Sequence, residues 1–276
     1  KSSMILNELM IKHLNKVCDF IYAKIPQQSP SFEKLKECKI ISLRGQHDNI
    51  SILENTLIAF DNAENNKGIW GIEFDFRWTK DIQPVVIHDS DLSRLFRSNI
   101  KISDIKLSEL KKLFPQIPSL QEVVQKYGGK LHLMVEAKEK HNTNHKKKEQ
   151  ILEEIFKNLI PKKDFHFLGL SADILDSINF IEDKSKIIVA IFNEKSLSEI
   201  AITKKYAGIG GHYLLINSSI VRKHLEFGQK IGVGYPISKN SIFREINRGI
   251  EWIFCNDAEK LCKIIKTELN KKNIIF

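Results

Sequence analysis

The chain has 276 residues, of which 42% are hydrophobic and 28% are charged, a composition typical of a globular protein with a full core. No stretch contains the roughly 18 uncharged apolar residues of a membrane-spanning helix, so we expect no membrane span. The formal net charge of +9 favours anionic ligands, but a nucleic acid is not expected, because the basic residues are not interleaved with stacking aromatics.

The chain opens with an apolar pattern from Ile5 to Ile25 whose spacing predicts an amphipathic helix. Short apolar runs then alternate with helical patterns, which is the order expected of repeated strand–helix units. The predicted strands are Lys39–Leu43, Ile69–Arg77, Pro84–His88, Leu131–Glu136, His166–Leu170, Lys186–Ile191, a run within Tyr206–Ile216, Lys230–Tyr235 and Trp252–Cys255. The predicted helices include Thr56–Asn65, Lys147–Leu159, Ala172–Glu182, Leu197–Lys205, Ser219–Phe227, Ile242–Asn247 and Ala258–Leu269.

The run Pro84–His88 follows Ile69–Arg77 too closely for a parallel crossover, so it should return as an antiparallel hairpin. The other eight strands, each with a following helix, predict an α/β fold, a (β/α)₈ TIM barrel whose sites lie at the C-terminal ends of the strands. We assign residues 39–276 to the barrel and residues 1–38 to an N-terminal helical extension packed on it. The segment Asp89–Gly129 is expected to form helices and turns over the barrel mouth. An open doubly wound sheet is the alternative fold.

Two of these strands carry acidic residues in apolar surroundings. Glu73 and Asp75 stand two apart in the run Trp70–Phe76, so a strand would point both carboxylates to the same face. Glu136 ends the run Leu131–Glu136 in the same way. Burying an ionised carboxylate is costly unless a cation compensates it. Three carboxylates on two strands therefore predict a site for a hard cation.

A histidine lies at the end of the predicted hairpin. If the turn centres near Lys80 and Asp81, the register places His88 opposite Glu73. A histidine beside metal-binding carboxylates is a candidate acid or base, because it exchanges a proton near neutral pH.

A basic cluster follows the strand that ends at Glu136. Such a run is usually a solvated surface, but it also favours phosphate groups or anionic lipid head groups, so contact with an anionic lipid surface is an expectation. Its members are Lys138, Lys140, His141, His145, Lys146, Lys147 and Lys148.

The four cysteines lack the Cys-x-x-Cys spacing of a zinc site and lie within apolar patterns, so we expect buried free thiols and a cytoplasmic location. They are Cys18, Cys38, Cys255 and Cys262.

The motifs of this chain, taken in order, resemble the glycerophosphodiester phosphodiesterase family over roughly residues 39 to 265. The first motifs are Arg44-Gly45, Leu53-Glu54-Asn55-Thr56, Ile72-Glu73-Phe74-Asp75 and Thr79-Lys80-Asp81. They continue with Val85-Val86-Ile87-His88-Asp89, Leu92, Arg94, Ile117-Pro118-Ser119-Leu120-Gln121-Glu122-Val123 and Val135-Glu136-Ala137-Lys138.

The resemblance implies a barrel enzyme that cleaves small phosphodiesters with a bound divalent cation. It implies that Glu73, Asp75 and Glu136 bind Ca²⁺ or Mg²⁺ and that Arg44 and Lys138 contact the substrate phosphate. His88 would be one of two acid/base histidines, so the implied catalytic residues are His88, Arg44 and Lys138. Glu54 is a further candidate for substrate binding, and the alternative for Glu54 and Asn55 is a cap on the following helix.

The chain departs from the family at two places. Where the family's signature begins His-Arg-Gly, this chain reads Leu43-Arg44-Gly45, and a leucine cannot transfer a proton. His47 is a candidate replacement, or a surface histidine without that role. Where the family usually has Trp-Thr, this chain has Tyr235-Pro236, so recognition of the leaving alcohol is expected to differ.

Two functions follow from these observations. The first is a metal-dependent hydrolase of glycerophosphodiesters or related phospholipid head-group diesters. The second is a catalytically impaired barrel that binds phosphate esters or lipid head groups without turnover, because Leu43 has removed one proton-transfer group.

Overall fold

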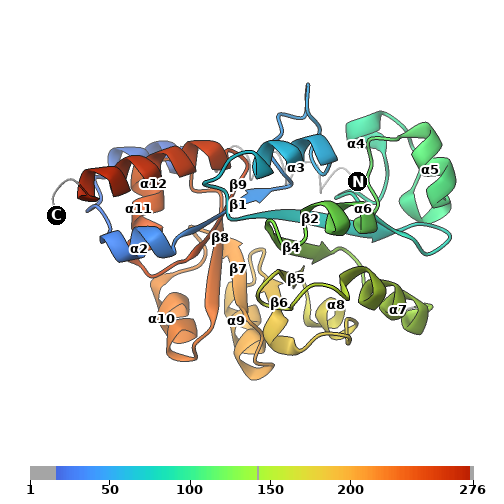
Figure 1. The fold of residues 1–276 in the computed structure, drawn as a ribbon. Helices are drawn as coiled ribbons and strands as arrows, with labels where there is room; N and C mark the ends of the chain where they lie inside the picture. Colours follow the sequence, from blue (N-terminus) through green and yellow to red (C-terminus); the bar gives the residue numbers. More distant parts are fainter. Residues whose placement is uncertain (1–16, 142, 274–276) are drawn as a thin grey trace.

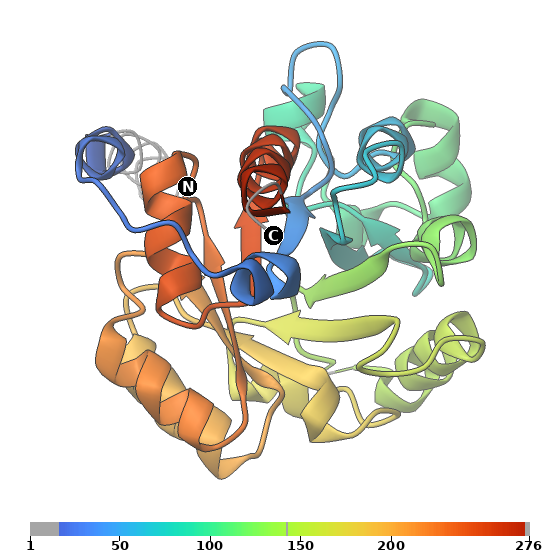
Figure 2. The same cartoon turned by 60° about the vertical axis from the view of Figure 1, so that its left-hand side comes forward.

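The computed structural model describes residues 17–141 and 143–273, and nine strands in this part of the chain form one sheet. Eight of them are parallel and close into a barrel in the order β1-β9-β8-β7-β6-β5-β4-β2, with β2 pairing back onto β1. The helices cover the outside of the barrel (Figures 1 and 2). The structure therefore confirms the predicted (β/α)₈ TIM barrel.

The strands agree closely with the predicted ones. They are β1 (Lys39–Leu43), β2 (Gly71–Trp78), β3 (Pro84–Val86), β4 (His132–Ala137), β5 (Phe165–Gly169), β6 (Lys186–Val189), β7 (Gly208–His212), β8 (Lys230–Gly234) and β9 (Trp252–Cys255). The helices are α2 (Phe32–Glu37), α3 (Leu57–Glu64), α4 (Ser93–Phe96), α5 (Leu107–Leu113), α6 (Leu120–Tyr127), α7 (His145–Phe156), α8 (Ala172–Asp176), α9 (Glu194–Thr203), α10 (Ser218–Glu226), α11 (Lys239–Asn247) and α12 (Ala258–Asn273), with 3₁₀ turns at Ile102–Asp104 and Asp183–Ser185.

One predicted helix is too long. The prediction extended it over Ala172–Glu182, but α8 ends at Asp176. The residues after it bond to other elements: Ser177 Oγ accepts from the backbone N–H of His141, and the backbone N–H of Asn179 donates to Glu149. The bond from Asn179 N–H to Glu149 takes the place of the backbone bond that a longer helix would make.

The predicted hairpin is confirmed, but its register differs by one residue. Strand β3 pairs antiparallel with β2, and Phe76 lies opposite Val86. Continuing this register places His88 opposite Phe74, so the prediction that His88 lies opposite Glu73 is wrong. The tight turn after β2, in which Thr79 N–H bonds to Gln83 O, sets the register.

The core has two layers because side chains alternate along each strand. Ile41 and Met134 belong to a cluster inside the barrel, whereas Phe74 and Phe76 pack outward against the helices. By the same alternation, Leu43, Glu73, Asp75 and Glu136 point inward at the C-terminal ends of their strands. Barrel closure therefore gathers these four side chains.

The segment after the hairpin builds a small core of its own, and α6 packs on the barrel. The buried members of this small core are Val85, Ile87, Leu92, Ile102, Ile105, Leu110 and Ile117.

Residues 17–24 are helical, and the earlier part of the helix predicted from Ile5 lies outside the described residues. Asp19 joins this helix to the start of α11, where its Oδ1 accepts from the N–H groups of Ile237 and Ser238 at 3.1 and 3.2 Å and from Ser241 Oγ at 2.8 Å. The assignment of residues 1–38 to a separate extension stays a prediction. Within the described residues, no helix is long and apolar enough to cross a membrane.

Candidate functional site

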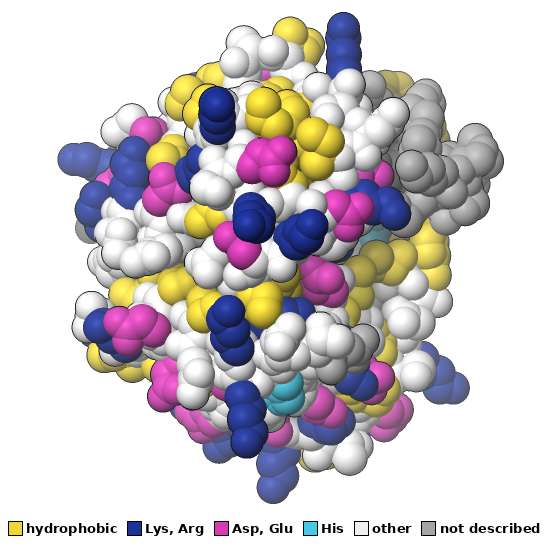
Figure 3. All heavy atoms as spheres, turned by 90° about the vertical axis from the view of Figure 1, so that its right-hand side faces the viewer, with side chains coloured by type: hydrophobic (Ala, Val, Ile, Leu, Met, Phe, Trp, Pro, Cys, Tyr) yellow, Lys and Arg dark blue, Asp and Glu magenta, His cyan; other side chains and the backbone are white. Residues whose placement is uncertain are grey.

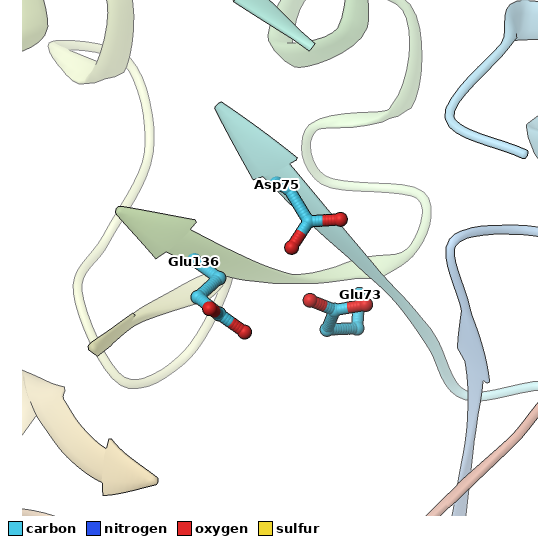
Figure 4. Close-up of side chains that lie close together, drawn as sticks. All are labelled: Glu73, Asp75 and Glu136. Carbon is cyan, nitrogen blue, oxygen red and sulfur yellow. The ribbon is translucent and has the colours of Figure 1, made fainter. Parts of the chain in front are cut away.

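The three predicted metal-binding carboxylates converge at the mouth of the barrel. Glu73 and Asp75 come from β2 and Glu136 from β4, and Figure 4 shows the three side chains turned toward one another. One oxygen of each lies within 4.8 Å of the others. Their residues are 2%, 0% and 8% exposed, so water screens their mutual repulsion weakly.

Two cations compensate part of this negative charge. Lys138 Nζ lies 2.7 Å from Asp75 Oδ1 and also pairs with Glu136. Arg44 Nε lies 3.3 Å from Asp75 Oδ2. Burial alone would raise the pKa of Asp75, but Lys138 and Arg44 hold it well below its usual range. Asp75 is therefore ionised at neutral pH.

Glu73 lacks such compensation. Its Oε2 accepts the backbone N–H of Arg44 at 3.3 Å, and in the described part of the chain no cationic side chain forms an ion pair with it. Burial, together with the charges of Asp75 and Glu136, raises the pKa of Glu73 well above its usual value. A divalent cation among the three carboxylates would remove this conflict, and an all-oxygen donor set suits Ca²⁺ or Mg²⁺.

Arg44 is held in place by a buried glutamate. Its backbone adopts a left-handed conformation, with φ 57°, directly after β1. Its Nη1 donates to Glu54 Oε1 at 2.9 Å, and Arg94 Nη2 and Asn49 Nδ2 donate to the same carboxylate at 2.5 and 2.6 Å. Burial would raise the pKa of Glu54, but Arg94 and Arg44 lower it to about 2. Glu54 thus orients the guanidinium groups in this structure, and a direct contact with substrate stays a prediction.

Neither Glu54 nor Asn55 caps the following helix. The N-cap of α3 is Thr56, whose hydroxyl accepts from Ala59 N–H. Asn55 instead adopts φ 58° and donates from Nδ2 to Asp75 Oδ2 at 2.9 Å. The capping interpretation is therefore wrong, because the loop turns both side chains toward the barrel mouth.

His88 follows the hairpin strand and is oriented by an aspartate. Its Nδ1 lies 2.9 Å from Asp89 Oδ1, and Asp89 Oδ2 accepts from Arg94 Nε at 2.6 Å. Because the carboxylate is an acceptor, Nδ1 carries the hydrogen, which leaves Nε2 free to accept a proton. The charge of His88 also contributes to lowering the pKa of Asp75, so the imidazole lies within electrostatic reach of the carboxylates.

Leu43 and His47 occupy different parts of the β1–α3 loop region. Leu43 ends β1 with Glu73 as its Cα partner on β2. His47 lines a cavity with Gln46 and Asn256. Neither of its ring nitrogens has a hydrogen-bond partner among the described residues, and burial lowers its pKa.

Sequence reasoning missed the supporting contacts of Asn55, Asp89 and Arg94, although these residues stood in the quoted motifs. Asn55 bonds to Asp75 and Arg94 to Glu54, which lie 20 and 40 residues away in the sequence, whereas Asp89 bonds to its neighbour His88 and to Arg94. A motif shows that a residue is present, but it does not show its partner.

Comparison with known proteins agrees with this geometry. The chain is 27% identical over 261 residues to a glycerophosphodiester phosphodiesterase of Caldanaerobacter subterraneus, an alignment that covers 82% of this chain and 97% of that protein. It is 29% identical over 117 residues to human glycerophosphodiester phosphodiesterase 1, and this match spans only 35% of the human protein.

Solved structures and a family profile extend the comparison. The crystal structure of a glycerophosphodiester phosphodiesterase from Thermotoga maritima matches with a TM-score of 0.68 at 26% identity, over 82% of this chain and 98% of that one. The profile of the glycerophosphoryl diester phosphodiesterase family matches residues 44–220, which is more than half of the chain. The chain therefore belongs to the glycerophosphoryl diester phosphodiesterase family and is a glycerophosphodiester phosphodiesterase-like hydrolase.

Proposed function

We propose that the protein is a metal-dependent phosphodiesterase that hydrolyses glycerophosphodiesters or related phospholipid head-group diesters. One observation carries this proposal: three buried carboxylates converge at the barrel mouth, and two cations stand beside them. This arrangement can hold a divalent cation and a phosphate group side by side.

The proposed metal ligands are Glu73, Asp75 and Glu136, and the cation is Ca²⁺ or Mg²⁺. When bound, such an ion would neutralise phosphodiester oxygens and favour ionisation of a hydroxyl. The small-molecule diester would place its phosphate against Arg44 and Lys138. Arg44 can offer two parallel donors, whereas Lys138 offers a point charge. Glu54 would keep the guanidinium of Arg44 oriented toward the mouth.

His88 would carry the proton transfer on one side of the phosphate. Its Nε2 would accept a proton from the attacking hydroxyl or water, while Asp89 stabilises the imidazolium that forms. We further propose that Leu43 stands where the family has its other acid/base histidine. A missing proton-transfer group costs about 10²–10⁴-fold in rate, so turnover would be slower than in a relative that retains both histidines.

The experiment that tests this function measures released glycerol phosphate from a small panel of glycerophosphodiesters. We expect turnover with Ca²⁺ or Mg²⁺ and loss of turnover with a chelator. The variant Glu73→Gln should lose the turnover that Ca²⁺ or Mg²⁺ supports, whereas the surface variant Asp173→Asn should keep it. Absence of turnover in every condition would reject the hydrolase.

Leu43 favours a second candidate, a barrel that binds phosphate esters or lipid head groups without cleaving them. In that case, titration calorimetry would show binding of glycerol phosphate that Lys138→Ala weakens, with no product from any diester. Absence of both turnover and binding would reject both candidates.

The basic cluster lies near the mouth, after β4 and at the start of α7. Figure 3 views the molecule from the side toward which β2 and β4 point in Figure 1, and Lys and Arg side chains are spread over this face among acidic ones. We propose that this face can meet an anionic lipid surface. Binding to anionic but not neutral vesicles would support this contact. A cytoplasmic location stays a prediction that imaging of the tagged protein would test.

A further inference from the structure

Tyr235 stands at the mouth in an unusual backbone conformation. It follows the last residue of β8 and adopts φ 76°, which is rare for a bulky residue. Its backbone N–H donates to Phe254 O on β9 at 3.0 Å. Strain of this kind persists where the surrounding structure enforces it, and it is frequent at active sites. Here it occurs directly after β8, at the C-terminal end of the barrel strands.

The ring of Tyr235 is held by an aromatic neighbour. His212, at the end of β7, lies opposite Gly234 in the parallel pairing. Its imidazole stacks on the Tyr235 ring with centroids 5.6 Å apart and planes 29° apart. The stack fixes the plane of the phenol and therefore the direction of its hydroxyl.

The phenol of Tyr235 lies within electrostatic reach of the proposed reaction centre, and it directly follows β8, which is not a neighbour of β2 or β4 in the barrel. The charges that act on this phenol belong to Arg44, Glu73, Glu136 and Lys138, which come from β1, β2 and β4 or directly follow them. Among the described residues, no hydrogen bond of the Tyr235 hydroxyl is present, although nearby buried groups such as Asp75 are bonded. The donor is therefore available to a molecule bound between Arg44 and Lys138.

We propose that Tyr235 is a further catalytic residue, whose hydroxyl donates a hydrogen bond, and then its proton, to the oxygen of the leaving alcohol. This inference rests on the proposed hydrolase. As the P–O bond to the leaving group breaks, the phenolic proton moves to that oxygen and the alcohol departs neutral. Arg44 and Lys138 stabilise the phenolate, which recovers a proton from water. Tyr235 would thus supply the proton to the leaving alcohol, a transfer that the side chain of Leu43 cannot make.

The test compares two leaving groups in the full-length chain. An alkyl leaving group needs a proton, whereas a p-nitrophenyl group departs as a stable anion. Tyr235→Phe, which keeps the ring stack, should lower kcat for a glycerophosphodiester by about 10² with little change in KM, and should change hydrolysis of the p-nitrophenyl diester by less than about threefold. The matched control is Tyr213→Phe, which removes a buried phenol that packs in the core. It should affect neither substrate.

A rescue variant separates proton donation from a structural role. Adding Leu43→His to Tyr235→Phe should restore much of the turnover of the glycerophosphodiester, because an imidazole would then stand at the end of β1. Equal losses on both substrates, no loss on either, or failure of the rescue would overturn the role of Tyr235. A wild-type protein that hydrolyses the p-nitrophenyl diester but not the glycerophosphodiester would overturn it too, while leaving phosphodiester cleavage intact. A wild-type protein inert toward both would refute the proposed hydrolase itself.

Discussion

Asp75 is the residue on which the charges of the site meet. Its two oxygens lie within 3.3 Å of Lys138, which follows β4, and of Arg44 and Asn55, which belong to the loop after β1. Glu73, two residues earlier on the same strand, has no such partners among the described residues. The difference follows from geometry, because Asp75 is nearer the end of β2 and so meets the loops that follow β1 and β4. Strand β2 thus carries two different carboxylates. The charge of Asp75 is compensated by Lys138 and Arg44, whereas no cationic side chain among the described residues pairs with Glu73.

Leu43→His should raise phosphodiester turnover at least about tenfold, because it adds a proton-transfer group opposite Glu73 in the pairing of β1 and β2. Steady-state assays of wild type, Leu43→His, His47→Ala and His88→Ala measure this effect. If His47 had already taken over the role, His47→Ala would abolish wild-type activity and Leu43→His would change little. Activity that survives both alanine substitutions would contradict a histidine-based mechanism.

At the scale of elements, the loop between β1 and α3 positions as many of the site's side chains as the strands do. Arg44 and Asn55 both adopt left-handed backbone conformations, with φ 57° and 58°, and Asn55 N–H donates to Arg44 O at 3.0 Å. This bond ties the two ends of the loop together. It aims Arg44 and Asn55 at Asp75 from one side, while Lys138 reaches it from β4. The site therefore depends on a folded loop of about a dozen residues as well as on β2.

The carboxylate cluster on β2 and β4 leads to a prediction about stability. A cation that binds only the folded state raises the free energy of unfolding by about 2.7 kcal/mol at a concentration a hundred times its Kd. We expect Ca²⁺ or Mg²⁺ to raise Tm of the wild-type protein measured by calorimetry. Glu73→Gln should lose this increase. Because its neighbours raise the pKa of Glu73, the metal-free variant should unfold at a temperature no lower than that of the metal-free wild type.

The matched control for this measurement is Asp173→Asn, which changes an exposed carboxylate outside the cluster. It should keep the metal-dependent increase in Tm. An equal increase in Glu73→Gln and wild type would show that the ion binds elsewhere.

Two histidines form a buried pair at the N-terminal end of the barrel strands, opposite the mouth. His132 Nε2 and His166 Nδ1 lie 2.8 Å apart, and both residues are almost fully buried. Trp70 stacks on His132, with ring centroids 4.1 Å apart, and Trp252 packs edge-on against His166. Aromatic rings therefore pack at the N-terminal end of the barrel, and charged groups gather at its mouth, with the interior apolar cluster between them. Burial lowers the pKa of His132 to about 4 and that of His166 to about 3.

This pair predicts how stability depends on pH. Unfolded histidines have a pKa of about 6.5, so above that pH both states keep the pair neutral. As pH falls below 6.5, the unfolded state binds protons that the folded state excludes until about pH 4, so the free energy of unfolding falls by up to about 1.4 kcal/mol per histidine per pH unit. Urea unfolding at pH 6.5 and 4.5 measures the loss.

The double variant His132→Asn/His166→Gln should lose less stability between these pH values than the wild type. His145→Gln serves as the control, because it removes a histidine whose side chain is 42% exposed. An equal loss in the wild type and the double variant would mean that the buried pair does not set the acid sensitivity.

The sequence by itself determined the elements whose signals are local. The strands Lys39–Leu43 and Trp252–Cys255 were predicted with the observed bounds, because a short apolar run between helical patterns identifies a buried strand. The shared face of Glu73 and Asp75 was also predictable, since it depends only on the two-residue period of a strand. The ordered motifs further indicated the family and the convergence of Glu136 with this pair.

Only the tertiary structure decided which distant groups meet. The turn after β2 sets the register that places His88 one residue away from its predicted partner. Glu54 gains its role from Arg94, forty residues later. Tyr235 is fixed by a left-handed backbone conformation and by the stacking of its ring on His212 of β7. None of these contacts has a period or a spacing in the sequence. They arise when the barrel closes and brings strand ends from opposite sides to one mouth, where charge compensation and ring packing select the final geometry.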